Sequence, residues 1–137
     1  MKIVSACLAW INCRWNGGGS PCQKIIALVK QGKAITVCPE QLGGLSTPRI
    51  PAEQKGDNVF TKEGKDVTKQ FKKGAEKVLE IAKSLNIKEA ILKQKSPSCG
   101  CGKIFDGTFS GELIQGDGVT TALLKKNGIQ VISEEDL

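Results

Sequence analysis

The chain has 137 residues and a formal net charge of +6, and it contains six cysteines but no histidine. The missing histidine excludes Ser-His-Asp and Cys-His catalysis and every zinc site with imidazole ligands, so proton transfer falls to Glu, Asp, Lys, Cys or water. The length predicts one domain over residues 1–137 whose hydrophobic core needs neither disulfides nor a metal to fold.

The amino-terminal segment predicts a strand, a loop and a helix. Residues 2–6 are a short apolar strand that ends at Cys7. Turn residues fill the following loop, and Ser20 with Pro21 predicts the N-cap and first position of a helix that ends near Gln31. Cys22 then falls on this helix as a small packed residue.

A second strand over residues 33–37 ends at Cys38. Glycines and prolines recur through residues 38–64, and they predict one long irregular segment, which in a compact domain is usually functional. Asp66 then predicts the cap of a long amphipathic helix to about Leu85.

The carboxyl-terminal part predicts a third strand over residues 87–93, a last helix over residues 118–126 and a last strand over residues 129–133. Between them, Asp106-Gly107 with aromatic flanks predicts a tight β-hairpin over residues 104–109. Strands that alternate with helices predict a three-layer α/β sandwich with a mainly parallel, Rossmann-like sheet and a small hairpin.

Three cysteines follow three of the predicted strands, at Cys7, Cys38 and Cys99. In a parallel sheet the loops after the strands open on one edge, where ligands bind. Cys99 also lies in a loop that Pro97 makes rigid and in which Gly100 has no side chain, as expected where a ligand is held close to the backbone. We therefore expect these thiols to converge on one crevice.

Thiolates that come from dispersed loops are typical ligands of an iron–sulfur cluster. Zinc is an alternative, but only Cys99 and Cys101 are closely spaced, and one intervening residue makes a poor zinc knuckle. Three ligands would leave one iron of a four-iron cluster open as a Lewis acid that accepts soft sulfur. The sequence leaves the roles of three residues undecided. Cys13 and Cys101 could be spare ligands or a sulfur relay, and Arg49 could bind either a substrate oxygen or a loop carbonyl.

Several segments in the right order resemble the DUF523 family, whose characterised members are thiouracil desulfurases (desulfidases). The segments are Ser5 to Leu8, Cys38 to Arg49, Gly64 to Thr68, Lys95 to Gly100, Phe105 to Gly107 and Gly128 to Glu134. The resemblance implies a [4Fe-4S] cluster on Cys7, Cys38 and Cys99, with an open iron that accepts the sulfur of a thiolated nucleobase. It also places the family's catalytic acidic residue and serine on Glu40 and Ser96.

This sequence departs from the family in two places. Trp15-Asn16-Gly17 stands where many members have Tyr-Asp-Gly, and Cys101 is extra. Ser98 is the alternative to Ser96 as the catalytic serine, and either residue could instead only cap a turn.

The expected activity is desulfuration of thiouracil to uracil without net electron transfer. Glu40 would activate the water or shuttle a proton, and Ser96 would orient water or the base. Thiolated RNA is an alternative substrate, which the positive charge weakly favours. Two alternatives are not enzymes: a carrier of sulfur or of an iron–sulfur cluster, and a binding module stabilised by zinc. No apolar run reaches the roughly 18 residues of a membrane span, so we expect a cytoplasmic protein whose partner is a small thiolated nucleobase.

Overall fold

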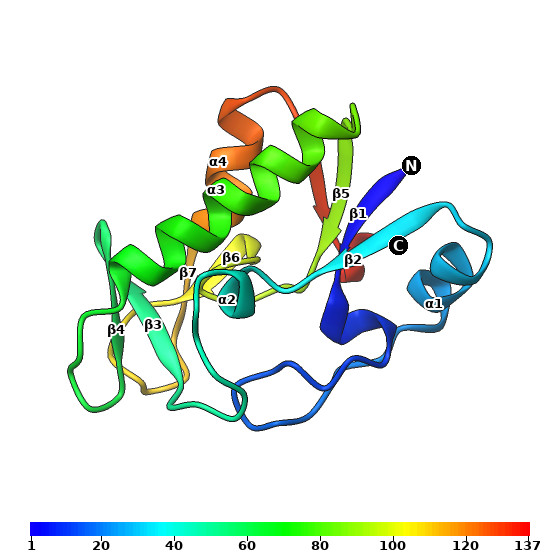
Figure 1. The fold of residues 1–137 in the computed structure, drawn as a ribbon. Coiled ribbons are helices and arrows are strands. Elements are labelled where there is room, and N and C mark those ends of the chain that lie inside the picture. The colour runs from blue at the N-terminus through cyan, green and yellow to red at the C-terminus, as the bar shows by residue number, and fades with distance from the viewer.

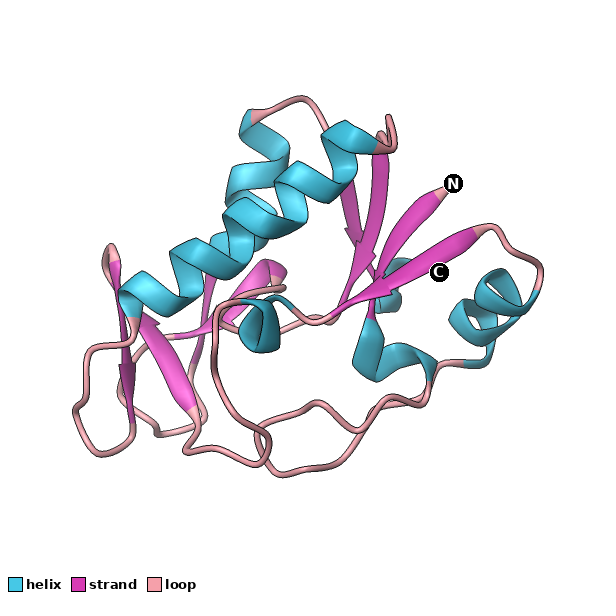
Figure 2. Ribbon diagram, in the orientation of Figure 1, coloured by secondary structure: helices cyan, strands magenta, loops and turns pink.

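The computed structural model describes all 137 residues, and a four-stranded parallel sheet in the order β2-β1-β5-β8 forms its centre (Figures 1 and 2). The elements in chain order are β1 (Lys2–Ser5), η1 (Ala6–Ala9), α1 (Gln23–Lys30), β2 (Ala34–Val37), α2 (Pro39–Leu42), β3 (Ala52–Lys55), β4 (Asn58–Thr61), α3 (Thr68–Ser84), β5 (Glu89–Leu92), β6 (Cys101–Phe105), β7 (Leu113–Asp117), α4 (Val119–Lys126), β8 (Gln130–Ser133) and η2 (Glu134–Asp136). None of the helices has the length and apolar character needed to cross a membrane.

Helices cover both faces of the sheet. Neighbouring residues of a strand point to opposite faces, and Ile3 and Val4 of β1 are both fully buried. Ile3 packs in a cluster with residues of α3 and α4, whereas Val4 packs in a second cluster with Ile25 of α1. Figure 1 shows α3 and α4 on one side of the sheet and α1 on the other. The predicted three-layer α/β sandwich is confirmed.

Helix α1 begins later than its turn residues predict. Ser20 and Cys22 donate their backbone N–H groups to the carbonyls of Cys7 and Leu8, which keeps this stretch extended. Cys22 is therefore the N-cap of α1, and the expectation that it lies inside the helix was wrong.

Residues 38–64 are not one irregular segment, because they contain the short helix α2 and the antiparallel hairpin of β3 and β4. Lys55 pairs with Asn58 across Gly56-Asp57, and Gly56 has the positive φ of 64° that such a two-residue turn requires. Gly-Asp is a known hairpin signal, so the sequence did carry evidence of this turn.

The second hairpin exists, but its turn is not at Asp106-Gly107. Strand β6 ends at Phe105, which pairs with Leu113 of β7, and residues 106–112 form a longer connecting loop. The tight turn predicted over residues 104–109 was therefore wrong in position.

Helix α3 is close to its predicted limits. Asp66 Oδ1 accepts a hydrogen bond from the Thr68 backbone N–H at 2.8 Å, as its role as a cap requires, although Val67 is the residue that directly precedes the helix.

Candidate active site

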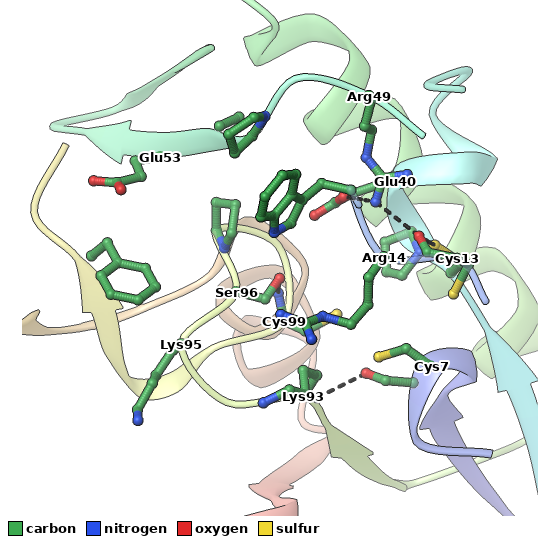
Figure 3. A pocket seen from close by; sticks show the side chains of 18 of the residues that line it. Cys7, Cys13, Arg14, Glu40, Arg49, Glu53, Lys93, Lys95, Ser96 and Cys99 are labelled. Carbon is green, nitrogen blue, oxygen red and sulfur yellow. Dashed lines mark hydrogen bonds and ion pairs between the residues drawn. The ribbon is translucent and has the colours of Figure 1, made fainter. Parts of the chain in front are cut away.

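Three neighbouring strands deliver the three strand-end cysteines to one place. Strand β1 pairs in parallel with β2 on one side and with β5 on the other. Cys7 lies in η1 directly after β1, Cys38 directly after β2, and Cys99 in the loop after β5. All three line one cavity of about 530 Å³, shown from close by in Figure 3. The structure thus brings together residues that are far apart in the sequence.

Cys13 also lines this cavity. Cys38 Sγ further lies 3.8 Å from the Cys13 carbonyl oxygen, to which it donates. The hydrogen bond to Cys38 lowers the pKa of the Cys13 thiol, but the bond to Cys7 and burial outweigh it and raise this pKa to about 11. The hydrogen bond to Cys13, followed by burial, raises the pKa of the Cys38 thiol.

Cys99 completes the set of cavity thiols. Burial raises the pKa of its thiol to about 12, against the opposite effect of a hydrogen bond with Ser5. Thiols in this state are protonated near neutral pH, and a bound metal would displace their protons.

The donor set fits an iron–sulfur cluster. Its cavity lies beyond the ends of three strands and is lined by the sulfur atoms of four cysteines, and the chain has no imidazole. These are features of such a site. No group of three or more Cys, Asp and Glu side chains is arranged around the position of a single metal ion. The other two cysteines lie elsewhere, because Cys22 packs beside α1 and Cys101 Sγ donates to the Val131 carbonyl oxygen at 3.5 Å.

Glu40 enters the cavity from α2, two residues after Cys38. Two glycines fix the place of this short helix against α3. A Cβ atom at Gly74 would lie 1.9 Å from the Pro39 carbonyl oxygen, and one at Gly43 would lie 2.0 Å from that of Gln70. The backbones of α2 and α3 are therefore in direct contact, and this contact sets the position of Cys38 and Glu40.

Arg49 forms an ion pair with Glu40, and the side chains are 10% and 15% exposed (Figure 3). The same guanidinium donates to the carbonyl oxygens of Cys13 and Ser46 at 3.0 Å and to Thr47 Oγ1 at 2.9 Å. Arg49 thereby connects the carboxylate to the loop that carries Cys13. Its binding of loop carbonyls is observed, and this arginine is a site residue that the sequence left undecided.

Ser96 lines the cavity, and its Oγ accepts hydrogen bonds from the backbone N–H groups of Ser98 and Cys99 at 3.1 and 3.0 Å. It therefore caps the turn before Cys99 while its own proton stays free to donate. Ser98 is fully buried, and its hydroxyl lies 2.7 Å from Thr120 Oγ1. Ser98 does not line the cavity.

Three aromatic residues also line the cavity, and we call them its aromatic wall: Trp15, Phe105 and Phe109. Glu53 of β3 holds the loop that carries Phe109, because its Oε1 accepts hydrogen bonds from the backbone N–H groups of Gly107 and Phe109 at 3.0 and 3.1 Å. The sequence did not reveal this wall, since it brings together the loop after η1, which carries Trp15, and the β6–β7 hairpin, which carries Phe105 and Phe109.

The comparisons with known proteins agree with this geometry. The model of the 2-thiouracil desulfurase family matches residues 3–136. The uncharacterized protein YbbK of Bacillus subtilis (strain 168) is 49% identical over 147 aligned positions, which cover 100% of this chain and 97% of YbbK. The solved structure of the [4Fe-4S]-dependent thiouracil desulfidase TudS (DUF523Vcz) is 47% identical and superposes with a TM-score of 0.94, over 98% of this chain and 91% of TudS.

Proposed function

Because the chain belongs to the 2-thiouracil desulfurase family, we propose that it converts a thiolated pyrimidine such as 2-thiouracil to the oxo base. The reaction exchanges the thione sulfur for the oxygen of one water molecule and releases sulfide, without net electron transfer. One observation carries the proposal, namely that Cys7, Cys38 and Cys99 line the same cavity as the Glu40 carboxylate. A sulfur carrier has no need of a carboxylate placed in this way.

Cys7, Cys38 and Cys99 would hold a [4Fe-4S] cluster, the cofactor on which TudS depends by its description. When bound, such a cluster supplies an iron with a free coordination position, a Lewis acid soft enough to bind thione sulfur and polarise the C=S bond. The fold supports the assignment, because Cys7 and Cys38 come within two residues of the ends of β1 and β2, and the hydrogen bond from the Cys99 backbone N–H to Ser96 Oγ holds Cys99 in the loop after β5.

Glu40 is the proposed base for the attacking water. Its carboxylate faces the cavity, and the ion pair with Arg49 keeps it in a single orientation there. A positioned carboxylate of this kind contributes roughly 10²–10⁴ in rate. Arg49 itself acts on Glu40 and is a positioning residue.

Ser96 is proposed to hold the pyrimidine ring or the water through the hydroxyl proton that its two accepted hydrogen bonds leave free. The planar ring would stack on the aromatic wall formed by Trp15, Phe105 and Phe109, which also limits access of water. All six cysteines are free, which suits the reducing cytoplasm, where we place the enzyme.

Purification and reconstitution without air test the proposal. Iron and acid-labile sulfide are measured per chain, and 2-thiouracil and a thiolated RNA are then assayed for release of sulfide. We expect cluster binding and turnover of the free base. Turnover of the polymer alone would move the substrate to RNA, and protein that binds zinc but no iron would contradict the proposal.

A further inference from the structure

Thr120 and Thr121 of α4 are both fully buried, and neither lines the cavity. Their hydroxyl groups are nevertheless bonded to the loop between β5 and β6, which carries Ser96 and Cys99. Thr120 Oγ1 lies 2.7 Å from Ser98 Oγ, and Thr121 Oγ1 donates a hydrogen bond to the Cys99 carbonyl oxygen at 2.9 Å. Two buried hydroxyl groups that the reaction does not use therefore join the start of a helix to this loop.

The start of α4 satisfies all four carbonyl oxygens of residues 97–100 in this loop. Three of them accept hydrogen bonds from backbone N–H groups, from Val119 to Pro97 at 3.0 Å, from Thr120 to Ser98 at 2.9 Å and from Gly118 to Gly100 at 2.7 Å. No backbone N–H donates to the fourth, the Cys99 carbonyl oxygen, and the Thr121 hydroxyl takes that place. Thr121 thus completes the attachment of the loop to α4.

This attachment also orients Ser96. The C=O and N–H groups of a planar trans peptide point in opposite directions. The two peptide groups whose carbonyl oxygens face α4 therefore direct their N–H groups, those of Ser98 and Cys99, to Ser96 Oγ on the other side. A Cβ atom at Gly118 would lie 2.4 Å from the Ser98 carbonyl oxygen, so the helix and the loop are in backbone contact.

We infer that Thr121 is a positioning residue, whose hydroxyl bond to the Cys99 carbonyl oxygen holds Ser96 and Cys99 in the arrangement that the proposed reaction needs. The inference rests on the proposed function, because it concerns the serine and the cluster ligand assigned there. Thr121 acts through these two residues and lies outside the cavity. Its effect can still be large, because a misplacement of about 1 Å can lower a rate by roughly 10²-fold.

The test compares two substitutions of Thr121 with one matched control. Thr121→Val keeps the shape of the side chain and removes its hydroxyl, whereas Thr121→Ser keeps the hydroxyl. Thr68→Val is the control, since Thr68 is also buried, lies outside the cavity and accepts a hydrogen bond from the Val59 N–H at 2.8 Å. We expect both valine variants to be less stable than wild type.

Activity should separate these variants. We expect only Thr121→Val to lose kcat per bound cluster, by roughly 10–10²-fold and with a smaller change in KM, and Thr121→Ser to keep most of the wild-type kcat. In a double-mutant cycle, Ser96→Ala should lower kcat by a smaller factor in Thr121→Val than in wild type, because Thr121 acts through Ser96.

Hydrogen exchange of the protein without a cluster gives a readout that does not depend on activity. The N–H groups of Ser98 and Cys99 should exchange roughly tenfold faster in Thr121→Val than in wild type, and at the wild-type rate in Thr68→Val. If Thr121→Val does not fold, Thr121→Ala removes the same hydroxyl and takes its place in every comparison.

Several results would overturn the inference. Wild-type loop exchange or wild-type kcat per cluster in Thr121→Val would do so, and so would an equal loss of kcat in Thr121→Ser or in Thr68→Val. Wild-type protein that binds no iron or does not turn over 2-thiouracil would instead refute the proposed function. Faster loop exchange in Thr121→Val would then still support the hold of Thr121 on the loop, so the two failures are distinguishable.

Discussion

The Arg49 guanidinium is paired with the Glu40 carboxylate in a largely buried position, at 10% and 15% exposure of the two side chains. Loss of one partner leaves the other charge uncompensated in a poorly solvated place, which costs roughly 3–5 kcal/mol. Arg49→Gln should therefore lower the free energy of unfolding by that amount and, because Glu40 loses its orientation, lower kcat by roughly 10²-fold. Chemical denaturation and steady-state kinetics measure both.

Lys2→Gln is the matched control, since it breaks the ion pair of Lys2 with Glu89 at the surface. The stability of this variant should stay close to that of wild type because exposed pairs contribute little. Equal effects of the two substitutions would contradict the special role of Arg49.

Replacement of Glu40 by Gln tests its role as the base. The amide keeps the shape of the side chain but takes no proton, so kcat should fall by roughly 10²–10⁴. Iron per chain should stay at the wild-type level. Glu80→Gln, on the exposed face of α3, is the control that should keep full activity. A Glu40→Gln enzyme with its cluster and wild-type kcat would remove this assignment.

Cys99 and Cys101 form a matched pair for the ligand assignment, because they are two residues apart and only Cys99 lines the cavity. Cys99→Ser should lose most of its iron on reconstitution, since a thiolate ligand is gone. Cys101→Ser should load fully, because that side chain faces the Val131 carbonyl oxygen instead. Iron analysis and the visible absorption of the cluster give the readout, and the reverse result would refute the ligand set.

Ser96→Ala separates a catalytic hydroxyl from a turn cap. The change leaves the N–H groups of Ser98 and Cys99 without their partner, which costs roughly 1–3 kcal/mol. If the hydroxyl also contacts substrate or water, kcat falls well beyond this effect while the cluster remains bound. Ser110→Ala in an exposed loop is the control. Unchanged kcat in a loaded, less stable Ser96→Ala protein would leave Ser96 as a turn cap alone.

Gly74→Ala tests the contact between α2 and α3. In an isolated helix this change stabilises by about 1 kcal/mol. Here the new Cβ would lie 1.9 Å from the Pro39 carbonyl oxygen, so we expect destabilisation by roughly 1–3 kcal/mol and, as α2 moves with Cys38, a lower iron content. Thermal unfolding and iron analysis measure these effects. Lys77→Ala on the exposed face of α3 should change neither quantity, and a stabilised Gly74→Ala protein would contradict the expectation.

The parts of the fold that follow from local pattern were predictable. The apolar strands, the period of α3 and the position of Cys7, Cys38 and Cys99 after strands placed these thiols at one edge of a parallel sheet. The start of α1 was not, because long-range backbone bonds from Ser20 and Cys22 override the cap signal.

Parts of the site depend on contacts between distant segments and could not be predicted. The pairing of Arg49 with Glu40 and with the Cys13 carbonyl oxygen joins three separate segments. Phe109 of the aromatic wall lies in the loop of the β6–β7 hairpin and is held there by Glu53 of the β3–β4 hairpin. Nothing in the spacing of these residues along the sequence indicates such contacts.

The position of β1 between β2 and β5 determines when the metal centre can be assembled. A ribosome has already released Cys7 and Cys38 long before Cys99 exists, and β1 has no partner on its second side until β5 is synthesised. With Cys7, Cys38 and Cys99 as the proposed ligands, we therefore expect the cluster to be completed only after residue 99 of 137 has been synthesised and β5 has paired with β1, late in the biogenesis of this protein.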